Sequence, residues 1–461
     1  MEVVINSPTF QGSSHPTLKD ADYPDPSTWI PFKPRLKSSN LDSLHSNWTN
    51  IFEIKINESS NHLKELIKKL NSSRNLNLSS NHLIIKIVNF NSVKDRFPHD
   101  PQSETNVLSK LDHQNIIPLL GHLDSPIHSN RCIFLPLYPV TLNYILDATN
   151  PSLIPSNFKH FQLFVQKVFR NITSGLAYLH SQSIAHRDLS PFNIVLSYDA
   201  TAVLIDFGTA WDGNPSPDSN HLEFELGTAC YRAPELLFGS RSYQPIGLDL
   251  WSLGVILAEF FRPFEPIHSY SSPLELSFSN HSAPARSDKI EDDQFSLYDN
   301  ATSWYSTSFA QFGPSSDLLN QPQMIRKTLF DGNIGDIGLV GSIFKIRGTP
   351  NETTWPEART LPDFSKLEFH QFEPQNLFDL LPFVKSSSSK ESDAKLTNTK
   401  EDQGLEPANQ VIDLIEKLLA YSSNKRLPAS EVLKHPWLAQ SKLDQAEESR
   451  LCAEIMSEWV Q

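Results

Sequence analysis

The sequence predicts an α+β fold, in which strand patterns near the start of the chain are followed by mainly helical patterns. Two stretches, Trp48–Lys55 and His82–Phe90, are dominated by apolar and β-branched residues, as strands are. Between Phe158 and His180, apolar residues recur at steps of three and four, which predicts one long buried helix. The remainder of the chain is mostly helical in pattern.

The first third of the chain is expected to contain a strand, a strand, a helix and a strand in that order. The polar run 57–81 separates the first two strands and predicts a long, partly helical connection. Ser103–Leu111 has helical spacing, and Asn115–Gly121 resumes a strand-like apolar run. Near the other end of the chain, Asp444–Val460 carries a weak helical pattern suited to packing on the exterior of the domain.

The composition indicates a globular protein that works on proteins and small molecules. At 461 residues and 39% hydrophobic, the chain can bury a large core. Its net charge of −14 argues against a protein whose main task is to neutralise nucleic-acid phosphates. No window approaches the roughly 18 consecutive apolar residues of a membrane-spanning helix, and residues 1–15 lack a secretory-signal pattern. We therefore expect an intracellular protein, in the cytoplasm, the nucleus or both, with no nucleic-acid or membrane partner.

The strongest chemical signal is the run His186–Asn193, HRDLSPFN, followed thirteen residues after Asn193 by Asp206–Gly208, DFG. Phosphoryl transfer needs one carboxylate to orient the attacking hydroxyl and accept its proton, and further oxygen ligands to hold magnesium across the phosphates. Asp188 suits the first role, and Asn193 and Asp206 suit the second. Two apolar stretches, 194–196 and 202–205, predict a short hairpin that brings these ligands together.

These motifs resemble those of protein kinases, and further matches follow in the order of that family. Ala233–Glu235 resembles the end of the activation segment, and Asp249–Gly254 resembles the start of the central helix of the large lobe. Arg426 stands where the family has an arginine, which the resemblance pairs with Glu235 in a structural role.

The small lobe carries the same resemblance. Leu83–Lys86 is similar to the strand with the ATP-anchoring lysine, and Glu104 opens the helix that supplies the ion-pair partner of this lysine. The resemblance implies a bilobal protein kinase fold with ATP between the lobes. It divides the chain into a poorly ordered leader (1–40), a kinase domain (41–438) with a small lobe (41–135) and a large lobe (142–438), inserts at 57–81, 269–323 and 385–404, and a C-terminal extension (439–461).

The resemblance also implies a site for ATP and Mg²⁺. Lys86 would contact the phosphates, and Thr228 would hydrogen-bond Asp188 and help to position it. The site residues that it implies are the catalytic Asp188, Arg187 and Thr228, the ATP-binding Lys86, Glu104, Leu135 and Tyr138, and the metal ligands Asn193 and Asp206.

The sequence departs from the family at the phosphate-covering turn. Most kinases use glycines there, because glycine lets backbone N–H groups approach the phosphate oxygens. This chain has no glycine between Gly12 and Gly121, and Leu44–Thr49 stands where the turn belongs. The departure fits either a divergent active kinase or a pseudokinase scaffold, and the intact Lys86 and Asp188 favour activity.

Ser190 is a second departure, because serine/threonine kinases usually place a lysine two residues after the catalytic aspartate. Its absence removes one charge near the transferred phosphoryl group and puts the hydroxyl preference in doubt. The segment Gly227–Arg232 nevertheless resembles the serine/threonine form.

Glu223 is the third departure. It stands twelve residues before Glu235, where cyclin-dependent kinases carry an activating phosphothreonine. Its carboxylate could supply part of the charge of a phosphate to an arginine cluster that includes Arg187, so Glu223 is a candidate regulatory residue. A solvated loop residue is the alternative.

Gly348–Pro350, Trp355–Glu357 and Leu361–Phe364 resemble the stretch after the central helix of the large lobe in cyclin-dependent kinases and their relatives. This stretch, the glycine-poor turn and the missing activating threonine together resemble the monomeric CDK-activating kinases of fungi. That resemblance implies a monomer that phosphorylates the activation-loop threonine of cyclin-dependent kinases and requires no cyclin of its own. Another proline-directed kinase of the cyclin-dependent branch, or a pseudokinase scaffold, remains the alternative.

Overall fold

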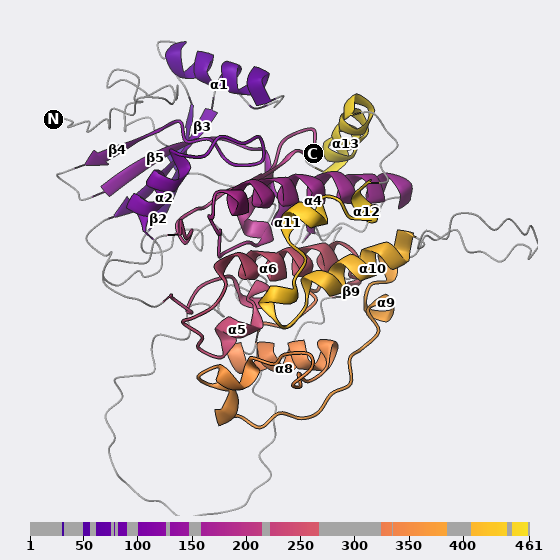
Figure 1. Cartoon of the computed structure of the whole chain (residues 1–461). Helices are drawn as coiled ribbons and strands as arrows, with labels where there is room; N and C mark the ends of the chain where they lie inside the picture. The colour runs from indigo at the N-terminus through magenta and orange to yellow at the C-terminus, as the bar shows by residue number, and fades with distance from the viewer. Residues whose placement is uncertain are drawn as a thin grey trace, which may run out of the picture.

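The computed structural model describes residues 30–31, 49–55, 61–74, 78, 82–89, 100–125, 130–146, 158–213, 222–266, 324–333, 335–384, 407–439 and 445–459. It has the expected α+β fold, with strands gathered in a small lobe and helices in a large one (Figure 1). The predicted leader lies outside the described residues except for 30–31. The predicted inserts 269–323 and 385–404 lie wholly outside them.

A five-stranded antiparallel sheet forms the small lobe, in the order β1-β2-β3-β5-β4. The central strand β3 places Leu83 and Ile85 in the core and Lys86 on the opposite face, because strand side chains alternate. Strands β2 and β3 confirm the two strands predicted from their apolar residues. The strands are β1 (Ile30–Pro31), β2 (Thr49–Lys55), β3 (His82–Asn89), β4 (Gly121–Ser125) and β5 (Asn130–Pro136).

Helix α1 (Asn61–Arg74) occupies the polar connection between β2 and β3, which confirms that the connection is partly helical. Ile67 on this helix is fully buried. The Asn71 side chain donates to the carbonyl of Leu78 at 2.9 Å and accepts from its N–H at 3.0 Å. The connection therefore contributes to the core of the small lobe.

Helix α2 (Pro101–Leu108) lies slightly ahead of the predicted range, 103–111. Asp100 explains the early start, because its carboxylate caps the helix by accepting from the N–H of Gln102 at 2.8 Å. Pro101 takes the first position, where a helix needs no N–H. Glu104 consequently lies in the first turn of α2.

The strand predicted over 115–121 was wrong. Ile116 makes a single bridge to Leu204, and the sheet resumes only at Gly121, where β4 begins. The N–H of Ile117 donates to Leu204 O at 3.0 Å, and the N–H of Leu204 donates to Asn115 O at 2.9 Å. The apolar residues of this segment are buried because they pack against a hairpin of the large lobe. Their apolar pattern therefore results from a contact between the lobes.

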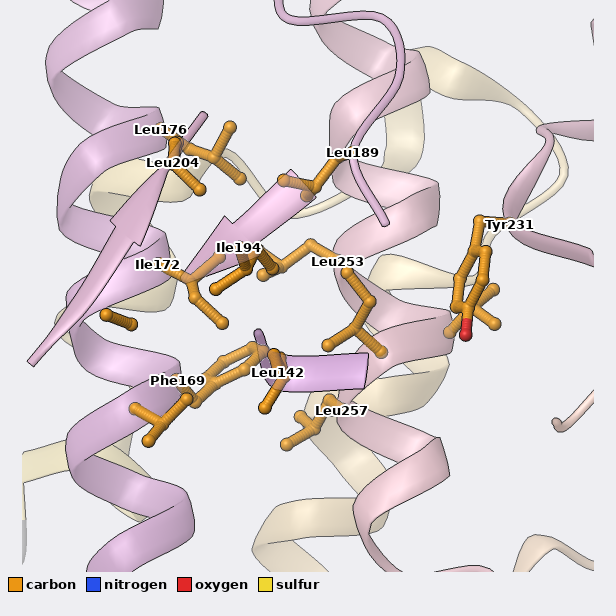
Figure 2. Packing of buried hydrophobic residues seen from close by; sticks show 14 of the residues in the cluster. Leu142, Phe169, Ile172, Leu176, Leu189, Ile194, Leu204, Tyr231, Leu253 and Leu257 are labelled. Carbon is orange, nitrogen blue, oxygen red and sulfur yellow. The ribbon is translucent and has the colours of Figure 1, made fainter. Parts of the chain in front are cut away.

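The core of the large lobe forms between α4 (Phe158–Ser181) and α6 (Pro245–Phe260). Helix α4 confirms the long helix predicted from its apolar stripe. Figure 2 shows Ile172 of α4 in one apolar cluster with Leu253 and Leu257 of α6 and with Ile194. Helix α6 is buried along nearly its whole length, which explains why it is apolar on all sides.

The remaining elements surround this core. Strands β7 and β8 form the predicted hairpin, joined by a register of Ile194 with Leu204. Among the described residues, no helix is long and apolar enough to cross a membrane. The elements are β6 (Val140–Thr141), α3 (Leu142–Leu146), β7 (Ile194–Leu196), β8 (Ala202–Leu204), α5 (Pro234–Leu237), β9 (Phe264–Pro266), β10 (Met324–Arg326), α8 (Gly335–Arg347), α9 (Leu377–Leu380), α10 (Pro407–Leu418), α11 (Ala429–Val432), α12 (Pro436–Ala439) and α13 (Gln445–Trp459).

Helix α13 packs against α4, as its helical pattern predicted (Figure 1). Arg170 of α4 donates to the carboxylate of Glu448 at 2.9 Å. Lys167 of α4 donates to Ser449 at 3.0 Å and to the carbonyl of Asp199 at 2.6 Å. Because Asp199 lies in the turn between β7 and β8, the same lysine holds both the C-terminal helix and the hairpin.

A buried ion pair joins α5 to the segment after α10. Arg426 donates to both carboxylate oxygens of Glu235, each at 2.7 Å. It also donates to the carbonyls of Gly247 at 2.8 Å and Tyr421 at 2.9 Å. The pair expected from the family resemblance is therefore present.

Arg426→Leu should lower the free energy of unfolding by about 3–5 kcal/mol, because it leaves the Glu235 carboxylate buried without its counter-charge. The urea midpoint, followed by tryptophan fluorescence, measures this change. Lys434→Ala removes the exposed pair between Lys434 and Glu431 and should change stability by less than about 0.5 kcal/mol. Equal midpoints for the Arg426 variant and the wild type would contradict the assignment.

Candidate active site

The buried Asp249 of α6 holds the backbone of the catalytic loop, His186–Asn193, in place. Asp249 is 1% exposed, and its carboxylate accepts from the N–H groups of His186 at 2.9 Å and Arg187 at 2.8 Å. His180 Nε2 lies 2.9 Å from the same carboxylate. A buried carboxylate is stable only when it is hydrogen-bonded, so Asp249 and the loop require each other.

Arg187 connects the catalytic loop to the segment after Asp206. Its φ of 65° lies in the left-handed region that residues other than glycine seldom adopt. The guanidinium donates from Nε to the carbonyl of Thr209 at 2.7 Å. Within the described contacts, Arg187, which was predicted to be catalytic, holds the backbone at Thr209. It therefore joins the catalytic loop to the segment after Asp206.

Both carboxylate oxygens of Asp188 are held by neighbouring side chains. Thr228 Oγ1 donates to Oδ1 at 2.7 Å, the contact that the resemblance predicted. Asn193 Nδ2 donates to Oδ2 at 3.0 Å and to the Asp188 carbonyl at 2.8 Å. The carboxylate therefore has a fixed orientation, which a base that must meet a substrate hydroxyl requires.

The β7–β8 hairpin brings Asn193 next to Asp206. The N–H of Ile205 donates to the carbonyl of Asn193 at 3.0 Å, so Asp206 directly follows a residue paired with Asn193. His186 adds a second link, because its Nε2 lies 2.9 Å from the carbonyl of Ile205. The hairpin predicted from two apolar stretches is thus what assembles the two candidate metal ligands.

Lys86 joins the two lobes through a pair of carboxylates. Its Nζ lies 2.9 Å from both oxygens of Glu104 and 2.8 Å from Oδ1 of Asp206. Burial disfavours the charge on Lys86, but Asp206 and Glu104 outweigh burial and raise the pKa of the ammonium above its ordinary value. Lys86 therefore stays positively charged at every physiological pH.

Asn193 and Asp206 fit a divalent cation such as Mg²⁺. Asn193 donates from its nitrogen to Asp188, which leaves the amide oxygen as the acceptor available to a metal. Among the described residues, no group of three or more His, Cys, Asp or Glu side chains could hold a metal by itself. Mg²⁺ commonly uses one or two protein oxygens together with substrate phosphates, and this donor set has that character.

The predicted ATP-binding residues Leu135 and Tyr138 lie between the lobes. Leu135 is near the end of β5, Tyr138 follows that strand, and both are buried. Leu135 pairs with Ile84 of β3, two residues before Lys86. The predicted contact of both residues with ATP stays a prediction. Residues 44–48, in the predicted position of the phosphate-covering turn, lie outside the described residues.

Glu223 is held in place through its backbone carbonyl group. The Tyr243 hydroxyl donates to Glu223 O and accepts from Arg187 Nη1 at 3.5 Å. Burial raises the pKa of Tyr243 above its ordinary value, although Arg187 acts in the opposite direction, so the hydroxyl keeps its proton. Within the described residues, the Glu223 carboxylate forms no ion pair with Arg187. Its regulatory role stays a prediction.

Ser190 is fully buried beneath the site. Its hydroxyl has no hydrogen-bond partner among the described residues. The side chain that replaces the usual lysine therefore brings neither charge nor a fixed contact to the catalytic loop.

Three supporting residues were not assigned a role in the site from the sequence. Asp249 was read as the start of a helix, and Tyr243 and Arg131 were not singled out. A usable signal existed for Asp249, which stands between Leu248 and Leu250, because a charged residue inside an apolar run implies a buried polar partner. Arg131 follows Asn130 at the polar start of β5 and gives no such signal.

Comparison with known proteins agrees with this geometry. The protein kinase domain family matches residues 73–438. A protein named Cyclin-dependent kinase 20 from Danio rerio is 24% identical over 355 residues, which cover 77% of this chain and 74% of that protein. The Homo sapiens protein of the same name is 24% identical over 361 residues, which cover 78% and 76% of the two chains. The chain therefore belongs to the protein kinase domain family, and it is a protein kinase similar to cyclin-dependent kinases.

Proposed function

We propose that this protein kinase transfers the γ-phosphate of ATP to a serine or threonine of another protein, with Mg²⁺ as its metal. One observation carries the proposal, a series of contacts in two parts that the β7–β8 hairpin brings together. One part runs from Glu104 through Lys86 to Asp206, and the other runs from Asn193 to Asp188. A pseudokinase scaffold catalyses no phosphoryl transfer. It therefore has no chemical need to keep the proton acceptor, the metal ligands and the phosphate-binding lysine together in one site. Activity is therefore favoured over the pseudokinase alternative.

Each residue of the series has a defined role in the transfer. Lys86, oriented by Glu104, places a fixed positive charge against the phosphates of ATP. Asp188 orients the attacking hydroxyl and takes its proton. Asn193 and Asp206 would hold the metal, and bound Mg²⁺ would supply further positive charge against the phosphates of ATP.

The preference for serine or threonine is supported by the segment around Thr228. Its hydroxyl bonds Asp188 as expected from the serine/threonine form of that segment. Ser190 leaves the usual lysine charge absent from the catalytic loop. Lys86 and the metal must then supply most of the positive charge around the transferred group.

The proposed substrate is the activation-segment threonine of a cyclin-dependent kinase. Three sequence features support it, namely the glycine-free segment before β2, Glu223 in place of a phosphorylatable threonine, and a large lobe similar to that of cyclin-dependent kinases. All three resemble the monomeric CDK-activating kinases of fungi. We accordingly propose a monomer that needs neither a cyclin nor an activating phosphate.

The activation segment has contacts that could hold it without a phosphate. Tyr243 bonds the carbonyl of Glu223, and Arg232 donates to the carbonyls of Leu226 at 3.1 Å and Phe224 at 3.3 Å. Arg241 stacks on the Phe224 ring at 4.9 Å. Backbone carbonyls are always present as acceptors, so this arrangement does not depend on a modifying enzyme.

Purified wild-type monomer should transfer labelled phosphate from ATP, with magnesium, to a catalytically inactive cyclin-dependent kinase. Asp188→Asn should lower kcat by roughly 10²–10⁴-fold, because the hydroxyl loses its proton acceptor while the Thr228 contact can persist. Mass spectrometry of the product locates the phosphate.

The alternatives give different results in the same assay. Transfer that appears only after a cyclin is added indicates an ordinary cyclin-dependent kinase, and transfer to another serine or threonine overturns the proposed substrate. No transfer and no ATP binding by the wild type would indicate a pseudokinase.

Tyr243→Phe should lower kcat/KM for the protein substrate roughly tenfold, because the activation segment loses its bond at Glu223 and Arg187 loses an acceptor. Glu223→Gln keeps the carbonyl and removes only the charge, so its smaller effect measures what the carboxylate contributes. Steady-state kinetics of both variants provides the comparison. Wild-type kinetics for Tyr243→Phe would exclude this hydroxyl as the support of the segment.

A further inference from the structure

Arg131 is a buried charge inside the sheet of the small lobe. It lies in β5, is 3% exposed, and stands directly opposite Asp124 of β4. Its Nε donates to Oδ1 of Asp124 at 2.6 Å and its Nη2 donates to Oδ2 at 2.7 Å. The two parallel bonds hold the guanidinium in one orientation, as a planar fork on a carboxylate does.

The third nitrogen of this guanidinium reaches helix α2. Nη1 donates to Thr105 Oγ1 at 2.6 Å and to the carbonyl of Pro101 at 3.3 Å. Thr105 is 2% exposed and follows Glu104 directly. Arg131 therefore ties the sheet to the first turn of α2, the turn that carries Glu104.

The first turn of α2 needs such a support. The helix has only eight residues, and a helix of that length is marginal without tertiary contacts. Glu104 lies near its N-terminus, where helices fray most easily. The N–H of Asp100 donates to the carbonyl of Gly208 at 2.9 Å, which ties the same turn to the DFG segment. Arg131 joins the same turn to the sheet.

We infer that Arg131 is a positioning residue for phosphoryl transfer, because it holds the first turn of α2 where Glu104 pairs with Lys86. The inference rests on the proposed ATP-dependent function and adds to it a means of placing α2 within a single chain. The Lys86–Glu104 pair is then present before any other protein binds.

A double-mutant cycle between Arg131 and Glu104 tests the inference. Arg131→Gln should lower kcat/KM for ATP by roughly tenfold to a hundredfold, because a small displacement of Glu104 misdirects Lys86. In a chain that already carries Glu104→Gln, the same substitution should cost less than about threefold, because the pair it protects no longer exists. A residue that only stabilises the fold would show the same loss in both backgrounds.

The affinity for magnesium and ATP, measured by isothermal titration calorimetry, gives a second reading of the cycle that needs no protein substrate. Wild-type chain that binds ATP but fails to phosphorylate a cyclin-dependent kinase would overturn the proposed substrate and leave this test intact. Wild-type chain that binds no ATP would overturn the proposed function and this inference together.

Two further variants separate positioning from stability. Thr105→Val removes the shorter of the two contacts from Arg131 to α2 and keeps the Arg131–Asp124 pair, and it should cost about fivefold in kcat/KM when measured well below its melting temperature. Arg170→Gln removes an arginine from an ion pair far from the site, with Glu448, and should leave kcat/KM unchanged. Because Asp124 is 47% exposed, Arg131→Gln leaves no deeply buried charge behind, and the variant should fold.

Wild-type kcat/KM in both Arg131→Gln and Thr105→Val would overturn the inference. Equal losses in the two Glu104 backgrounds would overturn it as well.

Discussion

The ion pair of Lys86 with Glu104 and Asp206 organises the site between the two lobes. It joins strand β3, helix α2 and the segment after β8, so one ammonium group fixes the two lobes relative to each other at the site. The side chain of Lys86 is only 12% exposed, which weakens screening by water and strengthens both contacts. A lysine without either carboxylate would carry an uncompensated charge into the same position.

Below this pair, the large lobe supports the catalytic loop on an apolar helix. Helix α6 is buried on nearly every side, and its carboxylate at Asp249 faces the loop backbone. Packing holds the helix rigid, and hydrogen bonds transfer that rigidity to His186 and Arg187. The Glu235–Arg426 pair serves the same end for the activation segment. The fixed position of the Asp188 side chain thus depends on buried groups that lie away from it in the large lobe.

Helix α2 and the activation segment are held in place by contacts within the chain. Arg131 ties α2 to the sheet, and Tyr243 ties Glu223 to Arg187. Both ties end on groups that are always present, a threonine hydroxyl and backbone carbonyls, so no modification is required to form them. These two sets of contacts support the proposal that the kinase needs neither a cyclin nor activating phosphorylation.

Local patterns predicted the α+β fold, the long helix α4, the β7–β8 hairpin and the spacing of Asp188, Asn193 and Asp206, because periodicity and motif spacing are local properties; the family resemblance predicted the two lobes. The same patterns misread 115–121 as a strand, since burial between lobes and burial in a sheet leave the same apolar pattern. The folded structure alone reveals which groups meet across large separations, such as Arg131 with Thr105 and Tyr243 with Glu223. Those contacts depend on how elements pack in three dimensions, and no local pattern records that.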